Sequence, residues 1–134
     1  AVWTEEELDT YLQFLFKHRS EMGDGSNFKK KTFSAAAEHM EQSGRASGGE
    51  KDWEACRSKW QKVKKTYEVI GDIKAHTGWT WSNETGASIT ALNSDSWANF
   101  LKKHPLAKPF RNTGWPHLDI MEEIMPYRAK GSLV

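Results

Sequence analysis

The amino-acid sequence predicts an all-α fold in which a three-helix core is followed by additional C-terminal helices. Two observations support this prediction. Apolar residues recur at intervals of three and four in separate segments, as on one face of a helix, and capping residues, glycines and prolines divide these segments. We expect residues 1–134 to form a single domain, with the three-helix core in 1–74 and a helical extension in 75–134.

The first predicted helix begins beside Thr4. This threonine and Glu7 have the spacing of a capping box, in which each side chain accepts a hydrogen bond from the other residue's backbone. The run from Gly23 to Ser26 ends the helix. Its apolar face consists of Leu8, Tyr11, Leu12, Leu15 and Phe16.

Two further helices complete the predicted core. The second extends from about Lys31 to Ser43 and is followed by a long Gly-rich loop. Its apolar residues are Phe33, Ala36, Ala37 and Met40. The third begins at Lys51 or Asp52 and ends at or near Gly71. Its apolar stripe is Trp53, Cys56, Trp60, Val63, Tyr67 and Ile70.

The sequence of the C-terminal part of the chain predicts shorter secondary-structure elements. The segment from Gly78 to Trp81 is aromatic without helical spacing, which indicates an ordered loop. A fourth helix is predicted from Thr90 to His104, before a proline, and a fifth from Pro116 to Met125. Between these two helices, Pro109 to Asn112 predict a turn.

Composition excludes several classes of protein. The single cysteine, Cys56, cannot form an internal disulfide and fits a reducing compartment. No segment approaches the ~18 consecutive apolar residues that a membrane span needs. The five histidines lack metal-ligand spacing, and no catalytic constellation is evident, so we expect no metal, no cofactor and no enzymatic activity. The position of Cys56 on an apolar face predicts a buried, inert thiol.

Charge is unevenly distributed along a chain whose net charge is only +1. Residues 1–24 carry six acids and two bases, whereas residues 51–65 carry six bases and two acids. The basic segment coincides with the third predicted helix, whose polar side is opposite its apolar stripe. A helix of this kind is suited to nucleic acid, because its cations can contact phosphates while its other face packs into a core.

Several motifs resemble those of the Myb/SANT-like domain, and within that group the trihelix-related branch of plant and fungal transposon-derived proteins. The core motifs are Trp3-Thr-Glu-Glu, the aromatics Phe28 and Phe33, and Cys56-x-x-Lys59-Trp60. The C-terminal motifs are Gly78-Trp79-Thr80-Trp81, Trp97, the run from His104 to Arg111, and Gly114 to Asp119. The resemblance implies a helix-turn-helix core, nucleic-acid binding in the nucleus, a role in transcription regulation or a transposon-derived protein, and no enzymatic activity.

The resemblance also implies which residues face the bases of double-stranded DNA. In Myb repeats these follow the position of Cys56, which singles out Arg57 and Ser58. Arg57 suits the O6 and N7 atoms of guanine, and Gln61 suits N6 and N7 of adenine. Glu54 can accept a hydrogen bond from cytosine, or can instead repel phosphate.

A second set of basic residues suits contacts to phosphates, which position a protein without reading sequence. On the third helix these residues are Lys62, Lys64 and Lys65. Lys29, Lys30 and Lys31 lie before the second helix, which also presents backbone N–H groups there. Arg45, in the Gly-rich loop, completes the predicted set of DNA-binding residues.

The sequence leaves a second function open, that of a SANT-like protein-interaction module. A basic partner such as a histone tail can dock on the acidic first helix, around Glu5, Glu6 and Asp9. Self-association is a further alternative. The surplus aromatics of residues 79–115, including Trp79 and Trp81, either brace the third helix against the C-terminal helices or form an exposed partner surface.

Overall fold

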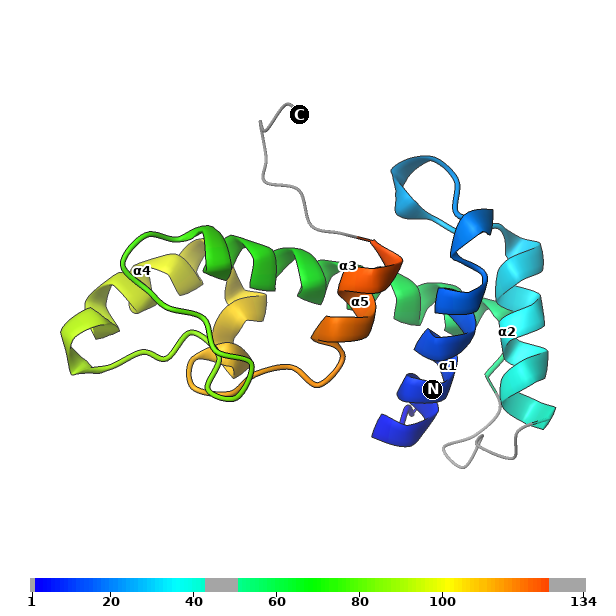
Figure 1. Ribbon diagram of the computed structural model, residues 1–134, viewed down its shortest axis with the longest axis horizontal. Coiled ribbons are helices and arrows are strands. Elements are labelled where there is room, and N and C mark those ends of the chain that lie inside the picture. Colours follow the sequence, from blue (N-terminus) through cyan, green and yellow to red (C-terminus); the bar gives the residue numbers. More distant parts are fainter. Residues whose placement is uncertain (1, 43–50, 126–134) are drawn as a thin grey trace. The chain divides into compact units, whose positions relative to one another are not determined.

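The computed structural model describes residues 2–42 and 51–125, and its elements confirm the all-α prediction. The α-helices are α1 (Glu5–Lys17), α2 (Lys30–Gln42), α3 (Trp53–Ala75), α4 (Ser94–Lys103) and α5 (Leu118–Ile124) (Figure 1). The shorter 3-10 helices are η1 (Arg19–Glu21), η2 (Asp24–Ser26), η3 (Ala91–Asn93) and η4 (Pro105–Phe110). Within the described ranges there is no strand, only an isolated bridge between Ser82 and Gly86.

The described residues fall into two compact units. One is drawn from Ala1–Lys62 and Asp119–Pro126, and the other from Val63–Leu118. Helix α3 therefore contributes its first turns to the first unit and its remaining turns to the second. None of the described helices is long and apolar enough to cross a membrane.

Helix α1 begins as the sequence predicts. The Thr4 hydroxyl accepts a hydrogen bond from the Glu7 backbone N–H, and a Glu7 carboxylate oxygen accepts one from the Thr4 N–H, each at 3.0 Å. This capping box satisfies two backbone donors that a helix start would otherwise leave without partners. The first turn also carries three glutamates, whose charge suits the positive end of the helix dipole.

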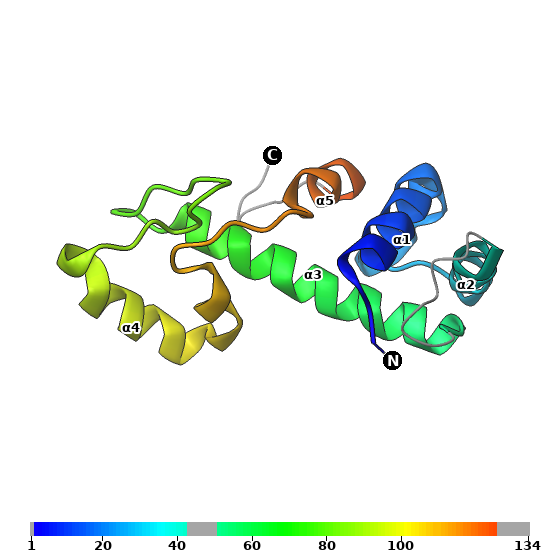
Figure 2. The same ribbon diagram turned by 90° about the horizontal axis from the view of Figure 1, so that it is seen from below.

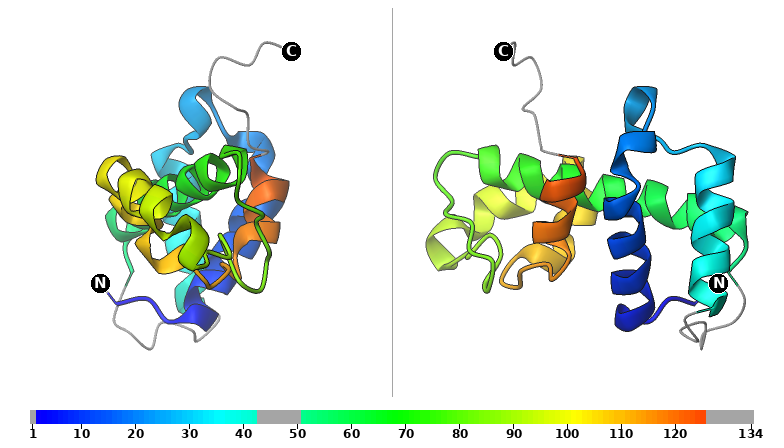
Figure 3. Two further views of the ribbon diagram at one scale, coloured as in Figure 1. Left: turned by 90° about the vertical axis from the view of Figure 1, so that its left-hand side faces the viewer. Right: turned by 45° about the vertical axis from the view of Figure 1, so that its right-hand side comes forward.

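Three helices build the core of the first unit. Helices α1 and α2 lie side by side and antiparallel, and both cross the first turns of α3 (Figure 3). The Tyr11 hydroxyl donates a 2.6 Å hydrogen bond to the Cys56 carbonyl, which ties α1 to α3. The buried apolar side chains contributed by these helices and by the segment before α2 are Leu8, Tyr11, Leu12, Leu15, Phe28, Phe33, Ala36, Met40, Cys56 and Trp60.

The apolar stripe predicted for α3 is largely confirmed. Cys56 and Trp60 are buried in the first unit, and Val63, Tyr67 and Ile70 are buried in the second. The prediction that Trp53 belongs to the core is wrong, because its ring is only half-buried. The helix also continues past Gly71 to Ala75, since Ile73 adds another buried residue to the same stripe.

The second unit is organised around Trp79, which is buried. Its ring stacks on His76, with centroids 3.6 Å apart and planes at 11°, and its indole N–H donates to the Ser96 hydroxyl. Trp97 and Phe100 of α4 contact the same indole edge-on. This packing favours the bracing role over the exposed-patch alternative for Trp79. Figure 2 shows α4 with the long loop that precedes it.

The remaining C-terminal elements agree with prediction in type and differ in their bounds. The predicted fourth helix is divided into η3 and α4, and the fifth is α5. Pro109 and Phe110, the first two residues of the turn predicted at 109–112, belong instead to η4, which begins at Pro105. Proline suits the first position of such a helix because its φ is already helical and its missing N–H would have had no partner.

Gly114 in the second unit allows a close approach between two backbone segments. A Cβ atom at this position would overlap the Asn83 carbonyl, and the Gly114 N–H donates a 3.3 Å hydrogen bond to the Glu84 carbonyl. The residue that begins one of the C-terminal motifs therefore has a steric reason to be glycine.

Candidate nucleic-acid interface

The first turns of α3 present an exposed polar face in the first unit. Glu54, Arg57, Ser58, Gln61 and Lys62 are all exposed, whereas Cys56 and Trp60 on the same turns are buried. This division follows from helix geometry, because residues at i, i+4 and i+7 share a side that the intervening positions do not. The residues predicted to face DNA on these turns are therefore accessible.

The segment before α2 is attached directly to α3. The Trp60 indole N–H donates a 3.0 Å hydrogen bond to the Ser26 carbonyl, and Phe28 contacts the same indole edge-on with centroids 5.2 Å apart. On the exposed side, the Gln61 amide donates a 2.9 Å hydrogen bond to the Asn27 side-chain oxygen. These contacts hold the start of α2 beside the polar face of α3.

Two predicted DNA-binding residues meet at the Trp53 ring. The Lys30 ammonium lies 4.7 Å from the ring centroid, and the Arg57 guanidinium carbon lies 5.4 Å from it. Lys30 is the first residue of α2, and Arg57 is one turn after Trp53 on α3. Cation–π attraction of this kind is worth about 0.5–1 kcal/mol at exposed sites. The ring thus brings one cation from each helix to the same place.

The other flank of the α3 polar face forms a pocket of about 290 Å³ beside the N-terminal segment. Its lining residues are Trp3, Glu54, Ala55, Ser58, Lys59 and Lys62. Burial lowers the pKa of Lys59, the charge of Lys62 lowers it further, and Glu5 partly opposes both effects. The charges of Lys59 and Lys62 give this flank a positive character, which suits an anion such as phosphate.

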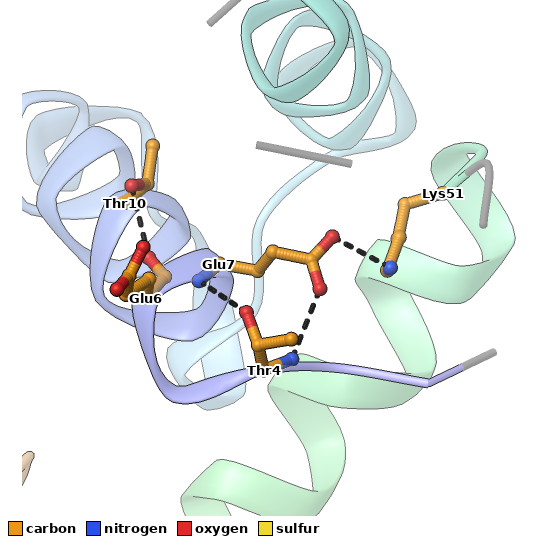
Figure 4. Close-up of polar contacts among 5 residues, drawn as sticks. All are labelled: Thr4, Glu6, Glu7, Thr10 and Lys51. Atoms are coloured by element: carbon orange, nitrogen blue, oxygen red, sulfur yellow. Dashed lines mark hydrogen bonds and ion pairs between the residues drawn. The ribbon is translucent and has the colours of Figure 1, made fainter. Parts of the chain in front are cut away.

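A buried ion pair fixes the start of α3 against α1. The Lys51 ammonium lies 2.7 Å from a Glu7 carboxylate oxygen, and the two side chains are 0% and 1% exposed. Figure 4 shows Glu7 between Lys51 and Thr4, accepting hydrogen bonds from both. The Lys51 ammonium also lies 5.5 Å from the Trp3 ring centroid. One carboxylate therefore links the helix cap, the α1 start and the segment that leads into α3.

The family model of the Myb/SANT-like DNA-binding domain matches residues 1–91. The chain belongs to this family. The comparisons with curated proteins and with solved structures give no match. Membership indicates DNA binding, suggests double-stranded DNA as the partner and a nuclear location, and places the chain in a family that is not enzymatic.

The other predicted contacts of this Myb/SANT-like domain differ in accessibility. Lys29, Lys31 and Lys65 are exposed, as a phosphate contact requires. Lys64 departs from the prediction, because it is buried in the second unit and burial lowers its pKa, with Glu68 partly opposing the shift. The long aliphatic stem of a lysine can pack against an apolar surface, so the charge of the residue alone does not predict its exposure. Arg45 lies outside the described residues.

Cys56, the single cysteine of this Myb/SANT-like domain, is buried. Burial raises the pKa of the Cys56 thiol to about 12, and the Asp52 charge adds to the effect. The thiol is therefore protonated at neutral pH and a poor nucleophile. Among the residues that the structure describes, no three or more His, Cys, Asp or Glu side chains gather as a metal site would require.

The sequence did not predict two residues of this candidate interface. Asn27 was not predicted, although an asparagine just before a helix can orient a neighbouring amide, as it does here with Gln61. Trp53 was assigned to the core because it has the right spacing. It lies at the first position of α3, however, where the ring is left half-exposed between two basic side chains.

Proposed function

We propose that this domain binds double-stranded DNA through the exposed polar face of the first turns of α3, with full or partial sequence specificity. The observation that carries the proposal is the assembly of Arg57, Gln61, Asn27 and Lys30 on one surface of the first unit. A helix that keeps one face in the core while offering donors on the other meets the requirements of a recognition helix.

The contacts of Gln61 support a role in reading adenine. Asn27 accepts one of the two N–H groups of the Gln61 amide, which fixes the orientation of that amide. The second N–H and the carbonyl oxygen are the two groups that pair with N7 and N6 of adenine. Arg57, which is exposed one turn earlier, has the donors that pair with guanine. We assign Ser58 and Glu54 to the same surface.

Phosphate contacts in the first unit come from Lys29, Lys30, Lys31 and Lys62. In the second unit, considered by itself, the exposed Lys65 suits a phosphate contact and the buried Lys64 does not. We further propose that 1–74 is the DNA-reading core and 75–134 an extension of it. The motifs around Trp79 and Gly114 support membership of the trihelix-related branch. That membership in turn supports a nuclear location and a role as part of a transcriptional regulator or a transposon-derived protein.

Replacing Arg57 with Ala is expected to change which duplexes are selected from a random pool. The loss of one bidentate base contact costs about 1–3 kcal/mol at the preferred site and relaxes specificity there. Replacing Lys62 with Ala is expected to weaken all duplexes alike, and to reduce the slope of log K against log salt by about one. Selection followed by fluorescence anisotropy over a salt series measures both effects.

The matched control for these substitutions is Lys17→Ala, which removes an exposed cation of α1 outside the proposed surface. It is expected to leave sequence preference and salt slope unchanged. If folded wild-type protein binds no duplex at low salt, the proposal is wrong. If Arg57→Ala keeps the sequence preference of wild type, Arg57 does not read a base.

A second candidate function, the binding of a basic protein segment, is supported by a groove in the first unit between α1 and α5. The groove has a volume of about 280 Å³. It is lined by Gln13, Phe16, Asp119, Ile120 and Glu123. Half-buried Phe16 and Ile120 can receive one apolar side chain, while exposed Asp119 and Glu123 attract lysine or arginine beside it. A basic peptide such as a histone tail has this chemistry.

A lysine-rich peptide with one central leucine is the probe for this groove. We expect wild-type protein to bind it in isothermal titration, and Asp119→Asn with Glu123→Gln to weaken binding about tenfold through lost charge complementarity. The matched control is Glu38→Gln on the exposed side of α2. Absence of heat at millimolar peptide, or equal weakening by the control, argues against this candidate.

A further inference from the structure

Trp53 is an aromatic residue whose surroundings do not match those of a core side chain. It has the spacing of the α3 apolar stripe, yet its ring is half-exposed while Cys56 and Trp60 are fully buried. The ring contacts a cation from α2, Lys30, and a cation from its own helix, Arg57. Packing alone does not explain why two basic side chains converge on it.

Within residues 2–42 and 51–125, no carboxylate lies within ion-pair distance of either cation. Among the described residues, neither Lys30 nor Arg57 forms an ion pair. Like charges repel, so both side chains would otherwise favour separate positions in water. The negative face of an indole attracts each of them, and Trp is the aromatic residue that does so most strongly. Trp53 therefore provides the attraction that keeps an uncompensated pair of cations together.

Two cations whose positions are already restricted are suited to binding a polyanion such as DNA. Lysine and arginine have many rotamers, and their immobilisation on binding opposes association. Contact with the Trp53 ring already restricts both side chains in the free protein, so less conformational entropy is lost when DNA binds. Arg57 lies on the α3 face proposed to enter the groove, and Lys30 lies at the start of α2, where a neighbouring phosphate would pass.

We infer that Trp53 is a positioning residue for DNA binding, which holds Arg57 ready for a base contact and Lys30 ready for the adjacent phosphate. The inference rests on the proposed function. In this arrangement Trp53 itself contacts no DNA, yet it affects both the sequence preference and the salt dependence of binding.

The test compares Trp53→Leu, which removes the π face, with Trp53→Phe, which restores an aromatic face. Trp53→Leu is expected to lower duplex affinity about tenfold at low salt, since two side chains lose their pre-ordering. Trp53→Phe is expected to recover at least half of that loss on a logarithmic scale. Circular dichroism and thermal melting establish that both variants fold.

A double-mutant cycle separates positioning from a merely structural role. In an Arg57→Met, Lys30→Met background, Trp53→Leu is expected to have little further effect on affinity, because no cation remains to be positioned. Phe14→Leu is the matched control, since the half-buried Phe14 ring on α1 stacks on His18 with centroids 4.2 Å apart, outside both proposed binding sites. This control is expected to leave duplex affinity unchanged.

Proton chemical shifts of the free protein provide a readout that needs no DNA. The side-chain methylenes of Arg57 and Lys30 are expected to show upfield ring-current shifts in wild type that Trp53→Leu abolishes. If wild type binds duplex and folded Trp53→Leu binds it equally well, or if the loss persists in full in the double-Met background, the inference is wrong and the proposed function stands. If wild type binds no duplex, both fail, whatever the shifts.

Discussion

Replacing Lys51 with Met is expected to lower the free energy of unfolding by about 3–5 kcal/mol, because it leaves the Glu7 carboxylate buried without its cation. The ammonium lies 2.7 Å from a Glu7 oxygen, and neither side chain is more than 1% exposed. Water therefore cannot replace the lost partner without opening the contact between α1 and the start of α3. Urea denaturation followed by circular dichroism measures the change.

The double variant Glu7→Leu, Lys51→Met is the informative comparison for this ion pair. It removes both charges, so the desolvation cost of the carboxylate disappears together with the attraction, and most of the lost stability is expected to return. Glu6→Gln is the matched single control, since Glu6 is exposed, and should change stability by about 0.5 kcal/mol or less. If the single Lys51 variant and the double variant lose equal free energy of unfolding, Lys51 stabilises the fold by its packing and not by its charge.

The same pair predicts how stability depends on pH. Burial by itself raises the pKa of Glu7, but the hydrogen bond and charge of Lys51, with the hydrogen bonds from Thr4, bring the pKa below its ordinary value of 4.5. A carboxyl whose pKa is lowered on folding contributes stability above its unfolded pKa and loses that contribution as pH falls through the folded one. Below about pH 4.5, wild type should lose stability more steeply than the double variant.

Local patterns in the sequence predicted those features whose causes are local. The capping box depends on two residues three positions apart, and the buried stripe of α3 depends on spacing within one helix. Both were visible in the sequence. The Glu7–Lys51 pair joins residues 44 positions apart, and the Gln61–Asn27 contact joins residues 34 apart. Neither follows a periodic pattern, so only the folded chain reveals them.

The errors in predicting the interface have a common physical cause. Residue type was taken as a guide to exposure, so Lys64 was expected on the surface and Trp53 in the core. Lys64 is buried because the stem of a lysine is apolar along most of its length. Trp53 is half-exposed because it lies at the first turn of α3, where fewer neighbours cover a side chain. Charge and hydropathy predicted that α3 has a buried stripe and an exposed basic side, but not the arrangement of side chains on that side.

Replacing Trp60 with Ala is expected to destabilise the first unit by about 3–5 kcal/mol, comparable with the loss of Lys51. The indole is completely buried, so truncation leaves a cavity, and Phe28 loses its edge-on contact. The Ser26 carbonyl also loses the donor that binds it at 3.0 Å. Thermal and urea denaturation measure the loss. A change of less than about 1 kcal/mol would mean that the core around α3 can repack without this ring.

Trp60→Phe separates the packing role of this residue from its hydrogen bond. The variant keeps an aromatic ring beside Phe28 but leaves the part-buried Ser26 carbonyl unpaired, at a cost of about 1–3 kcal/mol. Faster amide hydrogen exchange is expected in the segment before α2, because its attachment to α3 is weakened. That segment carries Asn27, which orients Gln61, and leads into Lys30. Duplex affinity should therefore fall several-fold in a variant that remains folded, and unchanged affinity despite faster exchange would mean that DNA itself can order this surface.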